Sequence, residues 1–585
     1  MTGGAGRRSH LARLAAVLGA WAALSLAVNL PPHVWALFTG WHLALALEVG
    51  AAFALIALWR GRRGTTPRAL AHGLAALLVL LVALRLADLT ARSVVARPLN
   101  LFLDVTLLPA LADVAETLLG PPLALALAAA LGIGILALHL GLARLLGAVG
   151  RRFDAAPVRR GFYAAAAAAV TVFAVQTVLP KAGPDWRPVA GSASRAVAEQ
   201  AGRLAETLDR RSAFRLAAAR DPAAGIPDRR VLAGLDGVDV LVIFIESYGV
   251  SAIDDPRYAP VVEPRLHRFR ERATGAGWSV TSGRLVSPTA GGQSWLAHAS
   301  LTSGLWISDQ TLYSLFLAEA GENTLVRDAA RSGRETVQLM PAITLPWPEG
   351  RRLGFERTYE AADFGYEGPN FYWGIVPDQF ALDVLADREL SPAPRRPLFA
   401  LAALSSSHAP WLPVPEVVAW EALGDGEIYR RWTEGAPTPR EVWRDYDAVR
   451  RQYALSVAHS LDAAAAFVAE RVDRPSLVIV LGDHQPAPLV TGPDASRAVP
   501  VHVMARDPAL VAPFRRLGFR PGMVPPPAPE GGDDALPRMD AVRGFLLEAF
   551  GRPAATAAPA VRPPAPPPPR SLPGPAASPA PAADR

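Results

Sequence analysis

Apolar runs long enough to cross a lipid bilayer fill the first 180 residues and decide what this chain can fold into. A helix needs about 20 apolar residues to span the hydrocarbon core. The sequence predicts five such spans, near 10–30, 36–59, 69–89, 121–147 and 161–180. Over the whole chain 51% of residues are hydrophobic and only 19% are charged, below the roughly 25% of soluble domains. We therefore expect a multi-pass membrane protein whose helical membrane domain covers residues 1–183.

A sixth apolar stretch, residues 98–119, differs from the others because it carries Asp104, Asp113 and Glu116. Carboxylates are costly in hydrocarbon, so we predict an interfacial or re-entrant helix here. The first span is not expected to be a cleavable signal, because further hydrophobic segments follow it and no clear small-residue cleavage site is present.

Three arginine clusters set the expected orientation of the spans. They precede the first span, separate the second from the third, and separate the fourth from the fifth: Arg7, Arg8 and Arg13; Arg60, Arg62, Arg63 and Arg68; Arg151, Arg152, Arg159 and Arg160. Basic loops stay in the cytoplasm, so five spans place everything after residue 180 outside it. We expect an inner (plasma) membrane protein with a periplasmic C-terminal domain. Because the positive charge flanks apolar runs, no nucleic-acid partner is indicated.

The rest of the chain divides by composition and pattern. Residues 184–235 are polar and helical in pattern, and we interpret them as a connector. From 236 to 550 short β-rich runs alternate with helical stretches, which predicts a parallel sheet with helices on both faces. The expected strands are 238–245, 335–340, 398–404, 477–481 and 500–504, and the clearest helix is 443–472. The Pro/Ala-rich tail, 551–585, holds few large apolar residues and is expected to be disordered.

Reactive side chains follow three of these strands. In such sheets ligands collect at the carboxyl ends of the strands. Glu246 follows the first strand, Asp483 and His484 follow the fourth, and His408 lies shortly after the third. Two carboxylates and an imidazole suit Zn²⁺ or Mn²⁺. We therefore predict one divalent metal ion, held by Glu246, Asp483 and His484.

Ser294 is the candidate nucleophile, because it follows a Gly-rich turn (290–293) and would begin an apolar helix. A helix start favours an anion, and a metal that takes the hydroxyl as its fourth ligand would activate it. His408 could protonate a leaving group or bind a phosphate oxygen. His298 and His502 are expected to be structural.

Structural explanations exist for each position taken alone: an Asp-His turn, a strand cap at Glu246, a helix cap at Ser294. A non-catalytic membrane protein that binds a lipid or glycan is therefore one alternative. The chain has no cysteine, so it has no Cys-derived formylglycine, and no arginine follows Ser294 in the pattern that marks a Ser-type sulfatase.

The segments IESYG, GGQS, SSSHAP and GDHQP, after a helical membrane domain, resemble the lipoteichoic-acid-synthase-like branch of the alkaline phosphatase/sulfatase superfamily. Phosphoglycerol and phosphoethanolamine transferases lie near it. The resemblance covers about residues 236–510 and implies a sulfatase-like α/β domain. It also implies one metal held by Glu246, Asp483, His484 and the nucleophile. That nucleophile is usually Thr, and here Ser294 stands in its place.

The resemblance assigns further residues to the substrate. The residue matching His408 binds the substrate phosphate or glycerol, and Trp347 matches an aromatic near the headgroup. The element Trp373–Asp378 recurs in the family, and we expect Trp373 to contact substrate as well. Lipoteichoic acid synthases carry an Arg two residues beyond that first Trp. Here the position is Glu349, which leaves the headgroup open.

The expected activity is transfer of a phosphoglycerol-type or phosphoethanolamine-type group. The donor would be a membrane phospholipid, the acceptor a glycan or other envelope hydroxyl, and the intermediate a covalent ester on Ser294. A phosphodiesterase or phosphatase that uses water as acceptor is the nearer alternative, and a sulfatase-type hydrolase the more distant one. The acceptor is not encoded in a motif.

Overall fold

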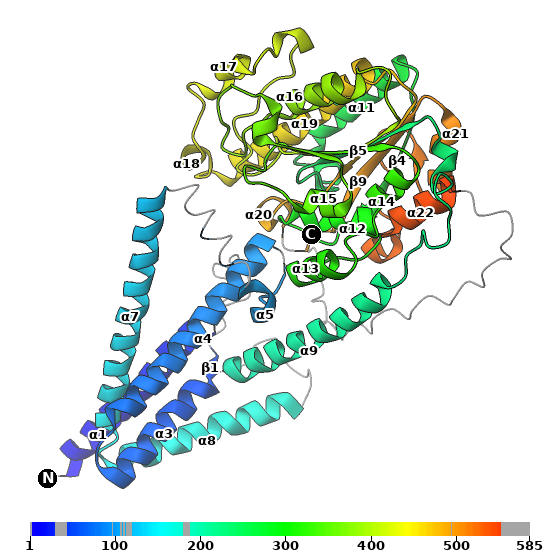
Figure 1. Cartoon of the computed structure of the whole chain (residues 1–585). Coiled ribbons are helices and arrows are strands. Elements are labelled where there is room, and N and C mark those ends of the chain that lie inside the picture. Colours follow the sequence, from blue (N-terminus) through cyan, green and yellow to red (C-terminus); the bar gives the residue numbers. More distant parts are fainter. Residues whose placement is uncertain are drawn as a thin grey trace, which may run out of the picture.

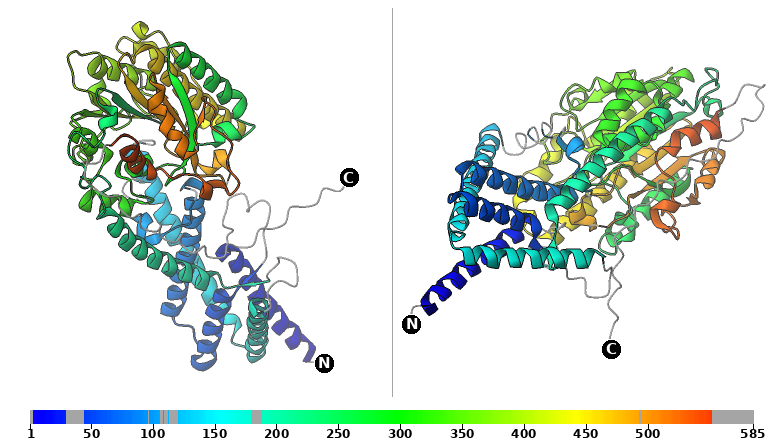
Figure 2. Two further views of the ribbon diagram at one scale, coloured as in Figure 1. Left: turned by 90° about the vertical axis from the view of Figure 1, so that its right-hand side faces the viewer. Right: turned by 90° about the horizontal axis from the view of Figure 1, so that it is seen from below.

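The computed structural model describes residues 3–29, 44–95, 97–105, 108, 112, 120–178, 188–492 and 494–551. Long helices form the N-terminal part, and an α/β domain forms the C-terminal part (Figure 1). The further views in Figure 2 show the same separation, with the helices gathered on one side of the α/β domain. The expected two-part architecture is confirmed. The Pro/Ala-rich tail after residue 551 lies outside the described residues.

The N-terminal part contains five long helices: α1 (Gly3–Val28), α3 (Leu47–Arg63), α4 (Arg68–Val95), α7 (Pro121–Arg152) and α8 (Ala156–Val178). Among the described residues, α1, α4, α7 and α8 are long and apolar enough to cross a membrane. Helix α3 lies in the second expected span, but residues 30–43 are outside the description, so five spans stay a prediction. Of the expected interfacial helix 98–119, one helix is described, α5 (Leu101–Asp104).

The start of α1, the α3–α4 turn and the α7–α8 turn lie at the end of the bundle away from the α/β domain (Figure 1). These are the places of the three arginine clusters. The second cluster is bonded to the α7–α8 turn, because Arg60 Nε donates to Asp154 Oδ1 at 2.6 Å. The pKa of Asp154 is lowered by this hydrogen bond. One end of the bundle is thus strongly basic, in keeping with the orientation expected from the sequence.

One eight-stranded sheet forms the centre of the α/β domain, in the order β10-β4-β9-β8-β3-β7-β5-β6. Its strands are β3 (Asp239–Ile245), β4 (Ser279–Val286), β5 (Glu335–Met340), β6 (Arg357–Glu360), β7 (Leu398–Leu404), β8 (Ser476–Gly482), β9 (Ala498–Ala505) and β10 (Arg520–Pro521). All five expected strands are present. Strands β8, β3, β7, β5 and β6 are parallel.

The predicted parallel sheet is present in these five strands, but the other edge of the sheet contains antiparallel pairs. Strand β9 runs antiparallel to both β8 and β4, and β10 runs antiparallel to β4. The physical reason lies in the connection from β8 to β9, whose one described helix is the four-residue α20 (Pro488–Thr491). A parallel neighbour needs a crossover, usually a full helix, so the chain turns back along the same edge instead.

Helices cover both faces of the sheet, as expected. One face packs on α11 (Ala259–Gly275), α16 (Asp378–Leu385) and α19 (Tyr446–Glu470), and the other on α12 (Ser294–Ser303), α13 (Gln310–Glu319), α14 (Leu325–Arg331) and α22 (Ala541–Phe550). Strand β3 supplies alternate residues to the two cores and is buried throughout. Such a continuous apolar run is typical of a parallel strand covered on both sides.

The carboxyl edge of the sheet is held next to the membrane helices. Helix α20 follows the end of β8 and packs against α4. The expected connector contains α9 (Ser192–Ala218), which contacts α3 and α13 and carries Arg215, whose Nη2 lies 2.9 Å from Glu319 Oε1. Whatever collects at the carboxyl ends of β3 and β8 therefore sits close to the membrane-spanning part.

Gly482 is required where β8 ends, because a Cβ there would lie 1.8 Å from the carbonyl oxygen of Tyr248. We expect Gly482→Ala to lower the free energy of unfolding by about 1–3 kcal/mol, as overpacking in a core does. The matched control is Gly544→Ala in α22, where nothing lies within 4 Å and the added helix propensity stabilises. Thermal unfolding of the detergent-purified chain measures both. Equal midpoints for the two variants would contradict the expectation.

Candidate metal and nucleophile site

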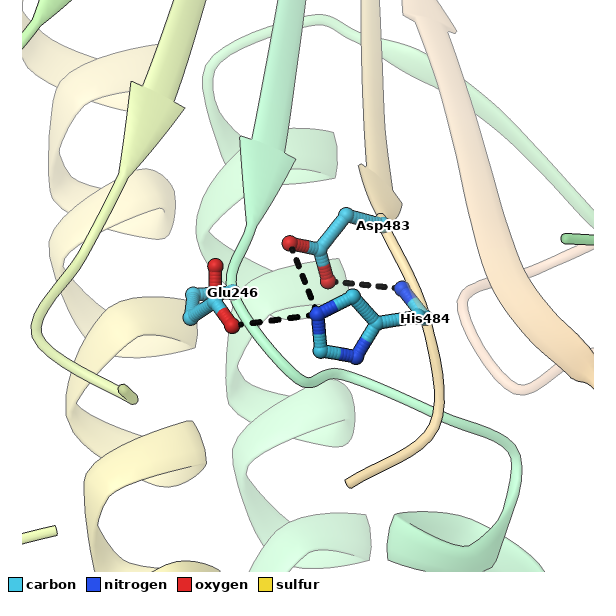
Figure 3. A group of neighbouring side chains, drawn as sticks. All are labelled: Glu246, Asp483 and His484. Atoms are coloured by element: carbon cyan, nitrogen blue, oxygen red, sulfur yellow. Dashed lines mark hydrogen bonds and ion pairs between the residues drawn. The ribbon is translucent and has the colours of Figure 1, made fainter. Parts of the chain in front are cut away.

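Three predicted metal ligands come together where β3 and β8 end side by side (Figure 3). His484 Nε2 lies 3.2 Å from Glu246 Oε1 and 3.7 Å from Asp483 Oδ2. One ligand atom from each residue lies within 4.8 Å of the other two. All three side chains are buried. The parallel pairing of β3 and β8 brings together residues 237 positions apart in the chain.

Backbone hydrogen bonds fix the orientation of the ligands. The Nδ1–H of His484 donates to Gln485 O at 2.8 Å, so Nε2 is the ring nitrogen that faces the centre of the group. Asp483 Oδ1 accepts from the amides of Ser247 (2.8 Å) and His484 (2.6 Å), so Oδ2 is the oxygen nearer the centre. Metal-bound histidines are held in this way. The donor set therefore fits Zn²⁺ or Mn²⁺.

The electrostatics of the group favour a cation. Although burial disfavours the imidazolium, Asp483 and Glu246 raise the pKa of His484 to about 9. Burial also opposes ionisation of Glu246, yet the His484 ring holds the pKa of that carboxyl well below its usual range. Burial and the neighbouring Glu246 raise the pKa of Asp483. Two carboxylates in so small a buried volume need a positive partner, which a divalent ion supplies.

Ser294 joins this group from the first residue of α12, as predicted. Its Oγ donates to Glu246 Oε2 at 2.8 Å and lies 3.2 Å from His484 Nε2. The turn before it is held in place, because the Gly291 amide donates to Gln485 O at 2.8 Å. That carbonyl also orients His484, so one peptide group positions both the nucleophile and the imidazole. The turn needs left-handed backbone at Gln293 (φ 65°).

His408 stands at the end of the turn after β7. Its Nδ1 donates to Ala409 O at 2.6 Å, which leaves Nε2 for a substrate. Asp378, at the start of α16, fixes this turn: its Oδ1 accepts from the amides of Ser405 and Ser406, both at 2.8 Å. The other oxygen accepts from Ser460 Oγ at 2.6 Å. Asp378 is a positioning residue that the sequence reasoning did not single out, although it belongs to the element 373–378.

We expect Asp378→Asn to lower turnover by about 10- to 100-fold, because an amide group replaces acceptors of charge-assisted bonds. The content of bound metal should not change, since Asp378 contacts none of the ligands. Metal analysis and a lipid-turnover assay on the same preparation separate the two effects. Asp425→Asn, in the loop before the short helix at 427–429, is the matched control. A parallel loss of metal would show that Asp378 supports the ligands instead.

A cavity of about 480 Å³ opens beside Ser294, and His408 and Trp347 line it as well. Trp373 does not line this cavity. It is 5% exposed, its Nε1 donates to Pro413 O at 3.1 Å, and its ring stacks on Phe371 with centroids 4.5 Å apart. The structure thus brings together every predicted site residue except Trp373, which packs under the loop that follows β7.

Among the polar residues that line the cavity, His298, Gln310 and Tyr313 were not assigned to the site by the sequence reasoning, whereas Glu349 was noted there only as the residue in place of an arginine. His298 was expected to be structural, but it lines the cavity one helical turn beyond Ser294, and its buried Nε2 has no hydrogen-bond partner. Burial lowers its pKa to about 4. The spacing of four on one helix was the available signal. His502 is structural as expected, because its ring nitrogens meet Ser282 Oγ (2.9 Å) and Tyr248 OH (3.0 Å).

No family model and no curated protein matches the sequence. Solved structures do match parts of it. The lipoteichoic acid synthase LtaP of Listeria monocytogenes is 13% identical, over 46% of this chain and 66% of that one, with a TM-score of 0.32. The phosphoglycerol transferase GacH of Streptococcus pyogenes, in complex with sn-glycerol-1-phosphate, is 13% identical, over 58% and 91%, with a TM-score of 0.34.

The C-terminal periplasmic domain of EptC from Escherichia coli, in complex with Zn, is 11% identical, over 53% of this chain and 96% of that one, with a TM-score of 0.32. These proteins are of the kind that the sequence motifs resemble. The overlaps are loose and the identities low, so the roles of the residues rest on the geometry of this chain.

Proposed function

We propose that this chain is a membrane-anchored, metal-dependent transferase. It moves a phosphoglycerol-type or phosphoethanolamine-type group from a membrane phospholipid to an acceptor hydroxyl on the outer side of the membrane. The transferred group passes through a covalent ester on Ser294. The acceptor is a glycan or another envelope component.

The observation that carries the proposal is the convergence on Ser294 Oγ. Glu246 Oε2 and His484 Nε2 lie 2.8 and 3.2 Å from that oxygen. A hydroxyl held at the start of a helix, beside two carboxylates and an imidazole, is equipped to become a nucleophile toward an anionic ester. A structural serine cap has no need of these buried partners.

One divalent ion, Mn²⁺ or Zn²⁺, would be held by Glu246, Asp483, His484 and Ser294 Oγ. When bound, it lowers the pKa of the serine hydroxyl and offsets negative charge on the phosphoryl oxygens.

In the first step Ser294 Oγ bonds to phosphorus and its proton passes to Glu246 Oε2, to which it already donates. The bond from phosphorus to the diacylglycerol oxygen breaks, and that oxygen takes a proton from His408 Nε2. In the second step the acceptor hydroxyl gives its proton to His408 and bonds to phosphorus. Ser294 Oγ then leaves and recovers its proton from Glu246.

The position of the site suits a lipid donor. The carboxyl edge of the sheet lies next to the membrane helices, because α20 rests on α4 directly after the ligand-bearing end of β8. A phospholipid headgroup in the outer leaflet is thus within the neighbourhood of Ser294. We also propose that the protein is a multi-pass protein of the inner (plasma) membrane with its catalytic domain in the periplasm, because the basic end of the helix bundle lies away from the α/β domain (Figure 1).

The test is release of diacylglycerol from phospholipid vesicles by the purified full-length chain, with Mn²⁺ or Zn²⁺, and with or without a glycan acceptor. We expect metal-dependent release that the acceptor accelerates. Release that is independent of the acceptor and yields the free phosphate ester would indicate a phosphodiesterase. Intact lipid in the presence of bound metal would contradict the proposal.

A further inference from the structure

The cavity beside Ser294 has a second end, away from the metal group, which we call the distal pole. From the nucleophile the cavity extends to the segment after β5 and to α13, where Trp347, Glu349 and Tyr313 line it. Glu349 is the first residue of α15 (Glu349–Leu353). A group esterified to Ser294 has this space to occupy, so these side chains are placed to contact the retained headgroup.

The charged side chains that line the cavity are all acidic or titratable histidines. Among the described residues no lysine or arginine lines it, whereas three carboxylates do: Glu246, Asp483 and Glu349. The first two belong to the metal group. Glu349 does not, and among the described residues no arginine or lysine forms an ion pair with it. Its charge acts on the cavity wall, because it adds to the effect of burial in raising the pKa of Tyr313. The distal pole therefore presents an uncompensated negative charge.

Aromatic rings line the same cavity as this carboxylate. Trp295, Tyr313 and Trp347 line the same cavity. The Nε1 of Trp295 is already used, because it donates to Gln310 Oε1 at 3.0 Å, and this bond fixes the indole in place. A carboxylate among aromatic rings is a binding site for an organic cation, which gains from both the charge and the ring quadrupoles. A neutral diol gains nothing from the rings in this way.

We propose that Glu349, with Trp347 and Tyr313, binds the ammonium group of an ethanolamine headgroup, so that the donor is a phosphatidylethanolamine-type lipid. This inference rests on the proposed function and narrows it to phosphoethanolamine transfer. Glu349 is the specificity-determining residue of the site.

The decisive variant is Glu349→Gln, which keeps the size of the side chain and an oxygen acceptor for hydroxyl groups but removes the charge. Full-length protein loaded with Zn²⁺ is assayed on vesicles that contain phosphatidylethanolamine or phosphatidylglycerol. We expect the unaltered chain to prefer phosphatidylethanolamine, and Glu349→Gln to lose about 10- to 100-fold of kcat/KM on that lipid only. Glu322→Gln, an exposed position after α13, is the matched control and should match the unaltered chain.

A binding measurement keeps the two proposals apart. Calorimetry with O-phosphoethanolamine and glycerol phosphate requires no turnover. Preferential binding of phosphoethanolamine that Glu349→Gln removes supports the ammonium site even if no lipid is turned over, an outcome that would sink the proposed function alone. Turnover of both lipids at similar rates, or an equal loss on both in Glu349→Gln, overturns the ammonium site and leaves the transferase intact.

Discussion

Ser294→Ala is expected to abolish diacylglycerol release, with a loss of at least about 1000-fold. Removal of a catalytic serine in enzymes with covalent intermediates has effects of this size or greater. The physical reason is that Ser294 Oγ is the atom that would bond to phosphorus, and Glu246 and His484 are arranged around it. A hydroxyl group is the only thing that the substitution removes, and α12 tolerates alanine at its first turn.

The matched control is Ser314→Ala on α13, an exposed serine close by in the fold. It should retain full activity. Ser294→Thr provides a second comparison, because it keeps the hydroxyl and should retain measurable turnover. If Ser294→Ala released diacylglycerol at the normal rate, a water molecule rather than a serine would be the nucleophile, and the covalent mechanism would be wrong.

Asp483→Asn is expected to reduce bound Zn²⁺ or Mn²⁺ from one equivalent per chain to background, and turnover by at least about 100-fold. The amide keeps the size of the side chain, and its oxygen can still accept from the amides of Ser247 and His484. The change therefore removes charge from the ligand group with little change in shape. Metal content is measured by mass spectrometry of the purified full-length chain.

Two further results should accompany this one. A chelator should inactivate the unaltered chain, and added metal should restore it and raise its thermal unfolding midpoint, because an ion that binds only the folded state stabilises it. Asp534→Asn, at an exposed position that forms no ion pair with any described residue, should bind metal normally. One equivalent of metal retained in Asp483→Asn would exclude the proposed ligand set.

Burial explains which strands could be read from the sequence. Strands β3 and β8 are apolar runs buried on both faces, so their pattern is continuous and their bounds were predicted to within one residue. Strand β4 was missed because Thr281, Ser282 and Arg284 interrupt the apolar pattern. The structure satisfies these polar groups in place: Arg284, for example, pairs with Asp254. Because these partners lie far from the strand in the sequence, the local sequence pattern does not show that the polar residues belong to a buried strand.

The site residues likewise divide into those that a local sequence pattern predicts and those that only tertiary packing brings together. Glu246, Asp483 and His484 directly follow strong strands, and parallel pairing then forces them together. Ser294 carried a local signal in its Gly-rich turn. Tyr313 lies on an ordinary helix, and only the tertiary packing makes it a wall of the same cavity as Glu349, which the motif around Trp347 had already brought to notice. Trp373 shows the converse, because a motif placed it near the site but its ring is packed under a loop.

The central claim is a covalent ester on Ser294, and intact-mass spectrometry tests it most directly. The purified full-length chain is incubated with mixed phospholipid vesicles and Zn²⁺ or Mn²⁺, without acceptor, and peptide mapping locates any adduct. The account predicts one metal-dependent adduct on Ser294, absent from Ser294→Ala, with the mass of phosphoethanolamine. An adduct on another residue, or metal-bound protein that turns over lipid yet never carries an adduct after rapid quenching, would contradict it.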